Sequence, residues 1–151
     1  MIQGRTTMTE ATVQWTDHDR FVGISSSRHS VVFDAGKEKT ANTPMELVLI
    51  GLCGCTASDV VNILRKKRQL FTGLQVNARA ERAAEPPAVY TEIHLIYRIA
   101  GKVDRKAVED AVRLSEGKYC SVAAMLSKTA TLSYSIEYFE DNAAWERSSA
   151  S

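Results

Sequence analysis

Cysteine is scarce in this chain of 151 residues, which contains three cysteines and only three prolines. No stretch is rich enough in proline, glycine or serine to act as a linker, so we expect a single domain. Hydrophobic residues make up 44% and charged residues 25% of the chain, which is the composition of a globular protein and excludes disordered and fibrous classes. At this length a core forms without disulfide or metal staples.

An excess of charge is also absent, because the formal net charge is +1 and acidic and basic residues are mixed along the chain. This balance gives no reason to expect a nucleic acid or an anionic membrane as a partner. Residues 1–15 contain no apolar run of signal-peptide length, and we expect no membrane span of about 18 apolar residues. A cytoplasmic protein with free thiols is therefore expected.

A long helix is predicted from Pro44 to Arg68, after three short strands over 12–15, 21–24 and 30–33. Its start signal is complete: Thr43 is the expected N-cap, Pro44 the first helical residue and Glu46 the capping-box partner of Thr43. The first half of the helix is apolar nearly all round, which predicts burial on most sides. The basic run at 65–68 suits the last turn, where cations complement the helix dipole.

Alternating apolar and polar residues return after this helix and predict a long antiparallel hairpin over 74–81 and 91–99. Asp104 is the expected cap of a second helix that stops at Gly117, and 132–138 form a last strand. The predicted order is β-β-β-α-β-β-α-β, an α+β fold in which a long central helix packs on antiparallel sheets.

The apolar central helix needs more cover than one sheet provides, so we expect an intertwined homodimer. The single domain is expected to span residues 9–141. Residues 1–8 are expected to form a flexible leader and 142–151 a flexible C-terminal tail, because neither has periodic apolar positions.

Cys53 and Cys55 form a C-x-C pair on the predicted central helix. Residues two apart point about 200° away from each other on a helix, so this pair is unsuited to ligate one metal ion. No C-x-x-C or H-x-x-x-H spacing is present, and we expect no metal. Cys53 lies in the apolar stretch and is expected to be a small buried hydrophobe.

Cys55 lies where the predicted helix changes from apolar to polar, with Asp59 four residues later on the same face. A half-shielded thiol of this kind is typical of reactive cysteines, although a structural role explains the composition equally well. Cys120 directly precedes Ser121, the expected cap of a short helical segment over 122–126, and Lys118 is near. A helix N-terminus and a cation both favour a thiolate, so a lowered pKa is expected for Cys120.

Three segments together resemble the OsmC/Ohr family of osmotically induced and organic-hydroperoxide-resistance proteins, and the OsmC-like branch most closely. These segments are Thr-Pro-Met-Glu-Leu-Val-Leu at 43–49, Gly-Cys-Thr at 54–56 and Lys-Tyr-Cys-Ser-Val at 118–122. The resemblance covers about residues 9–139. It implies an intertwined homodimer with two active sites, in which Cys55 is the peroxidatic and Cys120 the resolving cysteine.

The resemblance implies a thiol peroxidase that acts on organic hydroperoxides and hydrogen peroxide in oxidative-stress defence. Cys55 would become a sulfenic acid and condense with Cys120 to a disulfide, which an external dithiol reduces. No metal, haem or flavin is needed, because sulfur carries the electrons. The alternative is a dimer that binds a small ligand or senses redox state with little peroxidase activity.

The chain departs from the family pattern at the acid that follows the helix-starting proline. Met45 occupies that position and Glu46 follows, about 100° further round the helix, so Glu46 is better explained by the capping box. The resemblance also implies an arginine that stabilises the reactive thiolate. Arg20 and Arg28 are both candidates for this arginine, and the sequence does not choose between them.

Overall fold

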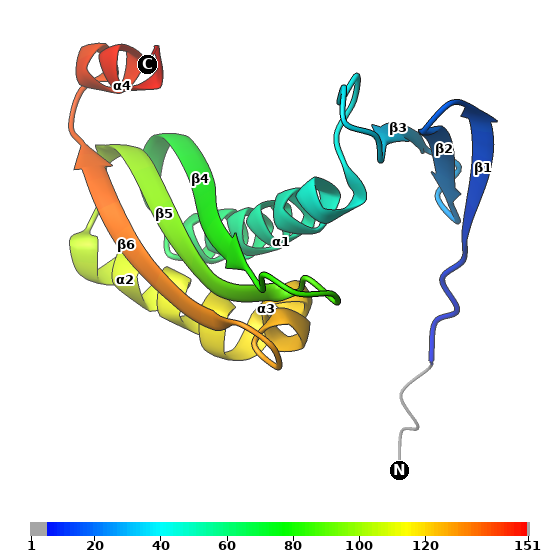
Figure 1. Ribbon diagram of the computed structural model, residues 1–151. Helices are drawn as coiled ribbons and strands as arrows, with labels where there is room; N and C mark the ends of the chain where they lie inside the picture. Colours follow the sequence, from blue (N-terminus) through cyan, green and yellow to red (C-terminus); the bar gives the residue numbers. More distant parts are fainter. Residues whose placement is uncertain (1–5, 151) are drawn as a thin grey trace. The chain divides into compact units, whose positions relative to one another are not determined.

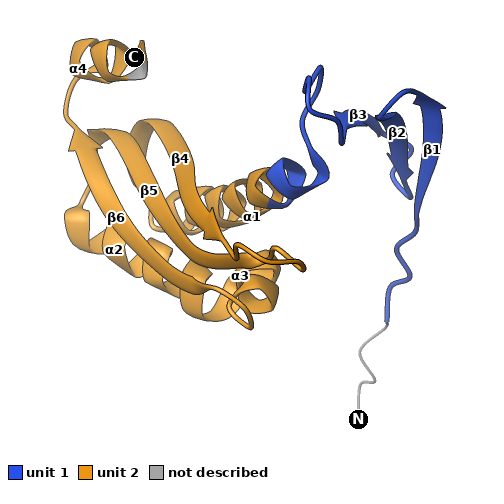
Figure 2. Ribbon diagram, viewed as in Figure 1, with its two compact units in different colours: residues 1–48 blue, residues 49–151 orange. Residues whose placement is uncertain are grey.

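The computed structural model describes residues 6–150, and part of the predicted leader therefore lies outside the described residues. The described chain has two compact units, residues 1–48 and 49–151 (Figure 2). The first unit contains β1 (Ala11–Asp17), β2 (Arg20–Ser25) and β3 (Ser30–Asp34). These strands form one antiparallel sheet in the order β1-β2-β3, which confirms the three predicted strands.

The second unit contains a three-stranded sheet and most of the helices (Figure 1). Its strands are β4 (Leu70–Arg82), β5 (Tyr90–Lys102) and β6 (Thr131–Phe139), with β5 in the middle. The helices are α1 (Pro44–Lys66), α2 (Arg105–Leu114), the π-helix η1 (Ser115–Tyr119), α3 (Ser121–Leu126) and α4 (Asn142–Ser149). The α+β class and the order of the main elements are as predicted.

One detail of the sheet differs from the prediction of antiparallel sheets. Strands β4 and β5 form the predicted antiparallel hairpin, but β6 pairs with β5 in parallel, from Glu92 opposite Thr131 to Ala100 opposite Phe139. The helical segment α2–η1–α3 lies between the two strands and returns the chain to the end where β5 began. A crossover of this length is what a parallel pair requires.

Helix α1 begins as the sequence predicts. The Thr43 backbone N–H donates to Glu46 Oε2 at 2.7 Å, and the Glu46 backbone N–H donates to Thr43 Oγ1 at 3.2 Å. These reciprocal bonds are a capping box, and they lower the pKa of Glu46 because the backbone N–H of Thr43 stabilises its ionised form. The helix ends at Lys66, two residues before the predicted end, and Arg68 has a positive φ of 55°.

One stripe of α1 is fully buried and packs in the core of the second unit. Leu52, Thr56, Val60 and Leu64 recur every four residues and are 0% exposed. The expected burial on most sides is not found within one chain, because Ile50 is 53% exposed. Contrary to the sequence expectation, α1 is long and apolar enough to cross a membrane, but its packed stripe is that of a core helix.

The segments after β5 differ from the prediction in three places. Gly117 does not end the second helix, because α2 continues through η1 to Tyr119. Cys120, not Ser121, caps α3, since its sulfur accepts a hydrogen bond from the Ala123 N–H. The predicted flexible tail contains α4, whose Trp145 ring makes an edge contact with Phe139 at 5.7 Å.

Replacing Thr43 with Ala removes the hydroxyl half of the capping box and should lower the free energy of unfolding by about 1 kcal/mol. Glu46→Gln should cost less, because glutamine also serves in a capping box. Urea denaturation followed by circular dichroism measures both changes. A Thr43→Ala protein as stable as the parent would contradict the capping role.

Candidate active site

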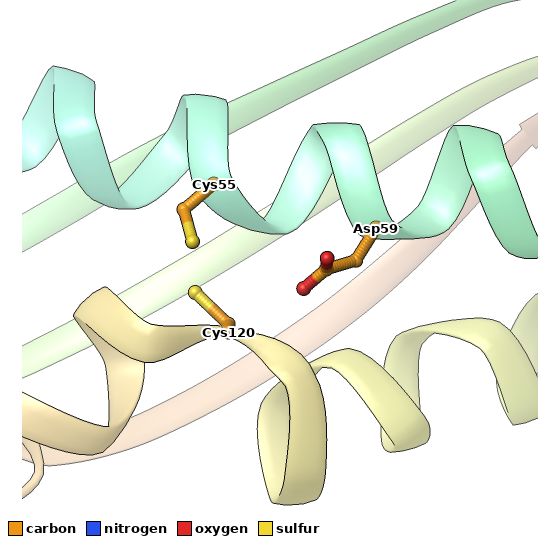
Figure 3. Close-up of side chains that lie close together, drawn as sticks. All are labelled: Cys55, Asp59 and Cys120. Atoms are coloured by element: carbon orange, nitrogen blue, oxygen red, sulfur yellow. The ribbon is translucent and has the colours of Figure 1, made fainter. Parts of the chain in front are cut away.

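Two cysteines that are remote in the sequence lie together in the second unit. The sulfur atoms of Cys55 and Cys120 and a carboxylate oxygen of Asp59 all lie within 4.8 Å of one another. Figure 3 shows Cys55 and Asp59 projecting from the same face of α1 toward Cys120. Both cysteines are free thiols in the structure; Cys55 is half-buried and Cys120 is buried.

Each element positions its own side chain for local reasons. Cys55 and Asp59 are four residues apart on α1 and therefore share one face of the helix. Cys120 has an extended backbone and follows η1, where its backbone N–H donates to the Ser115 carbonyl at 2.9 Å. Its sulfur accepts from the Ala123 N–H at 3.3 Å, which fixes the side chain at the start of α3.

Burial raises the pKa of the Cys120 thiol to about 12. The Ala123 N–H opposes this change by stabilising the thiolate, while the neighbouring Cys55 and the charge of Asp59 raise the pKa further. The expectation of a lowered pKa for Cys120 was therefore wrong. Desolvation and a carboxylate outweigh one hydrogen bond at the helix terminus.

A buried cluster of hydroxyl groups lies beside the two cysteines, and the sequence did not predict it. Thr56 Oγ1 lies 2.6 Å from Tyr97 OH and 2.9 Å from Ser115 Oγ. Tyr97 OH donates to Glu116 Oε1 at 2.5 Å, and Ser115 Oγ donates to Asp59 Oδ2 at 2.9 Å. The available signal was the position of polar Thr56 on the stripe that α1 buries.

Two thiols and one carboxylate are metal-ligand types, but this cluster falls short of a structural zinc site. Such sites need four protein ligands, and no fourth cysteine, histidine or acidic side chain joins the cluster within residues 6–150. The raised pKa of Cys120 also disfavours the thiolate that a metal requires. We therefore interpret Cys55, Asp59 and Cys120 as a thiol site.

The supporting residues named from the sequence have partners of their own in the first unit. Glu46 is engaged in the capping box, and Arg20 pairs with Asp17 through both its Nε and Nη2 atoms. Arg28 has a positive φ of 63° at the turn between β2 and β3. A role for Glu46, Arg20 or Arg28 beside Cys55 stays a prediction.

Cys53 is half-buried, not fully buried as expected. It lines a hollow between α1 and β4 together with Leu49, Ile50, Gly54, Ala57 and residues 76–79. Burial raises the pKa of its thiol. Since its sulfur is not part of the Cys55–Cys120 cluster, Cys53 is a suitable control thiol on the same helix.

In the reduced protein, Cys120 should react very slowly with iodoacetamide. A pKa of about 12 against the ordinary 9.0 reduces the thiolate fraction at a given pH about a thousandfold. Asp59→Asn should raise the rate, because the carboxylate charge disfavours the thiolate. Mass spectrometry of alkylated peptides over a range of pH measures the rate, and urea-unfolded protein is the control. Equal rates in folded and unfolded protein at pH 8 would contradict the raised pKa.

Comparison with known proteins adds a family to this geometry. The sequence model of the OsmC-like protein family matches residues 36–135. Protein YhfA of Escherichia coli K12 is 40% identical over 129 residues, which cover 85% of this chain and 96% of YhfA.

Solved structures share the fold. A hypothetical protein from Aquifex aeolicus VF5 is 31% identical with a TM-score of 0.76, covering 89% of this chain and 100% of the other. An organic hydroperoxide resistance protein OsmC from Legionella pneumophila has a TM-score of 0.67 at 14% identity, covering 88% and 98%. The matched family model and the long alignment with YhfA lead to one conclusion: this chain belongs to the family of OsmC-like proteins.

Proposed function

We propose that this protein is a thiol-dependent peroxidase, with Cys55 as the peroxidatic and Cys120 as the resolving cysteine. The observation that carries the proposal is the separation of the two sulfurs, which lie within 4.8 Å although the residues are far apart in the sequence. Membership of the OsmC-like family, which shares its fold with a hydroperoxide resistance protein, supports a role in peroxide resistance. We place this role in oxidative-stress defence in the cytoplasm.

The first chemical step is the attack of the Cys55 sulfur on the O–O bond of a peroxide. An S–O bond forms and the O–O bond breaks, so that sulfur loses two electrons and the leaving oxygen takes a proton to become an alcohol or water. Organic hydroperoxides are favoured as substrates, because the first half of α1 is apolar.

The second step joins the two sulfurs. Cys120 attacks the sulfenic acid of Cys55, an S–S bond forms, and the S–O bond breaks. The departing hydroxide takes the proton of the Cys120 thiol and leaves as water. An external dithiol then reduces the disulfide by exchange, so the cycle uses no cofactor of the protein.

A second candidate function is favoured by the hollow that Cys53 lines. Its apolar residues from α1 suit a small apolar or thiol-bearing ligand, and the raised pKa of Cys120 suits a slow redox sensor. A protein of this kind would bind or sense with little peroxidase activity. The rate of peroxide consumption separates the two functions.

Cumene hydroperoxide, and more slowly hydrogen peroxide, should convert the reduced protein to a Cys55–Cys120 disulfide that peptide mass spectrometry detects. Cys55→Ser should abolish dithiol-dependent peroxide consumption, and Cys120→Ser should stop at an oxidised Cys55. Cys53→Ser is the matched control and should behave as the parent. If both thiols stay reduced, or if Cys55→Ser keeps full turnover, the peroxidase proposal is abandoned.

The protein is also proposed to act as an intertwined homodimer. The sheet of the first unit exposes large apolar side chains, among them Trp15 at 63% and Val32 at 52%, and α1 exposes Ile50. Apolar faces of this kind are typical of surfaces that a partner covers. An isolated three-stranded sheet also needs a packed hydrophobic face to be stable.

Light scattering during gel filtration should give about twice the chain mass of 16.7 kDa. Val32→Asp places a charge on the exposed sheet and should shift the protein toward a monomer, because the charge would have to be buried. Val89→Asp, at an exposed apolar residue outside both strands and helices, is the matched control. A monomeric parent protein would overturn the dimer.

A further inference from the structure

Five oxygen atoms form an unbroken line from Glu116 to Asp59. The oxygens follow one another in the order Glu116, Tyr97, Thr56, Ser115 and Asp59, with separations of 2.5, 2.6, 2.9 and 2.9 Å. The three hydroxyl-bearing residues are 0% exposed, so their oxygens exchange hydrogen bonds with one another and not with bulk water. The line ends at the carboxylate that lies within 4.8 Å of both sulfurs.

The protons of this line can be counted. Tyr97, Thr56 and Ser115 each carry one hydroxyl proton, which gives three protons for four oxygen–oxygen contacts. When both carboxylates are ionised, Tyr97 donates to Glu116 and Ser115 donates to Asp59. The single proton of Thr56 then serves only one of its two contacts, and one contact has no proton.

One added proton fills all four contacts. If it binds to Glu116, every hydroxyl donates in the direction of Asp59; if it binds to Asp59, every hydroxyl donates in the direction of Glu116. The two arrangements interconvert when each proton moves across one contact. Burial raises the pKa of Glu116, which favours the proton at that end of the line.

We propose that Glu116, Tyr97, Thr56 and Ser115 form a proton relay that ends on Asp59, and that Asp59 is the catalytic residue that takes the proton from each thiol of the Cys55–Cys120 pair. The relay rests on the proposed peroxidase function and specifies how its site handles protons. Asp59 lies beside the reacting sulfurs, and the other four are positioning residues that act through it.

The proton balance of both steps follows from this relay. In the first step the Cys55 proton moves to Asp59 and along the line, the thiolate attacks the peroxide, and the proton returns through Asp59 to the leaving alkoxide or hydroxide. In the second step the Cys120 proton moves to Asp59 as the S–S bond forms, and the hydroxide released from Cys55 takes it to become water. The relay is unchanged after each step.

The groups that face the relay make its pH dependence simple to test. Asp59 faces Cys55 on its own helix and Cys120 and Ser115 on the packed segment, while Glu116 faces Tyr97 of β5. Lys118, the nearby cation in η1, lies over the Tyr119 ring at 5.3 Å. The titratable groups next to the relay are therefore the two thiols that it serves.

Thr56→Val tests the relay without touching a titratable group, because valine has the shape of threonine and no hydroxyl. A proton on Asp59 or Glu116 then leaves Ser115 or Tyr97 without an acceptor. The pH profile of Cys55 alkylation by iodoacetamide should move upward by about one pH unit, the equivalent of one hydrogen bond. Glu116 should titrate lower by a similar amount, followed by carboxyl ¹³C NMR with Glu116→Gln for assignment.

Two companion variants separate the relay from a packing effect. Thr56→Ser restores a hydroxyl and should rescue both profiles, whereas a packing defect would not be rescued by the smaller side chain. Ser58→Ala removes an exposed hydroxyl from the same helix and should change nothing. Asp59→Asn should slow disulfide formation with peroxide about 100-fold at pH 7.

The alkylation and carboxyl titrations do not require peroxide, so they test the relay even if peroxide leaves the thiols reduced. Thr56→Val with parental profiles for both Cys55 and Glu116 overturns the relay. Failure of peroxide to oxidise Cys55 in the parent, with both profiles shifted in Thr56→Val, overturns the peroxidase function and keeps the proton coupling. Cys55 alkylation that is indifferent to Asp59→Asn overturns the role of Asp59.

Discussion

The buried hydroxyl of Thr56 is the interaction on which the arrangement of the site depends. It joins α1 to β5 through Tyr97 and to η1 through Ser115, in a region with no exposed surface at any of the three residues. Polar groups buried in this way cost free energy unless each finds its partner, so only one registration of the three elements satisfies them all. Because Thr56 directly follows Cys55, that registration also sets where the reactive helix meets Cys120.

Local features of the fold were predictable because short segments of sequence determine them. The capping box of α1 needs only Thr43 and Glu46 three residues apart, and the β4–β5 hairpin needs only alternating polarity. The family resemblance rested on similar short motifs around Cys55 and Cys120. The parallel pairing of β6 was missed, because it depends on the length and path of the connection and not on the strand itself.

The chemistry of the site was less predictable than its residues. Helix spacing placed Asp59 on the face of Cys55, but only the packing of α1 against η1 brings Ser115, Glu116 and Cys120 to that face. The expected lowering of the Cys120 pKa considered a helix terminus and a nearby lysine and left out burial. Burial is a property of the folded chain, and here it reverses the sign of the effect.

The π-turn between α2 and α3 holds one more residue per turn than an α-helix does, as the bond from the Cys120 N–H to the Ser115 carbonyl records. Deleting a single residue from this turn would restore regular α-helical pairing and rotate everything after it by about 100°. Ser115 would keep its place, but Cys120 would no longer face α1. A change in chain length of one residue, with no substitution at any reactive group, is therefore enough to disconnect this site.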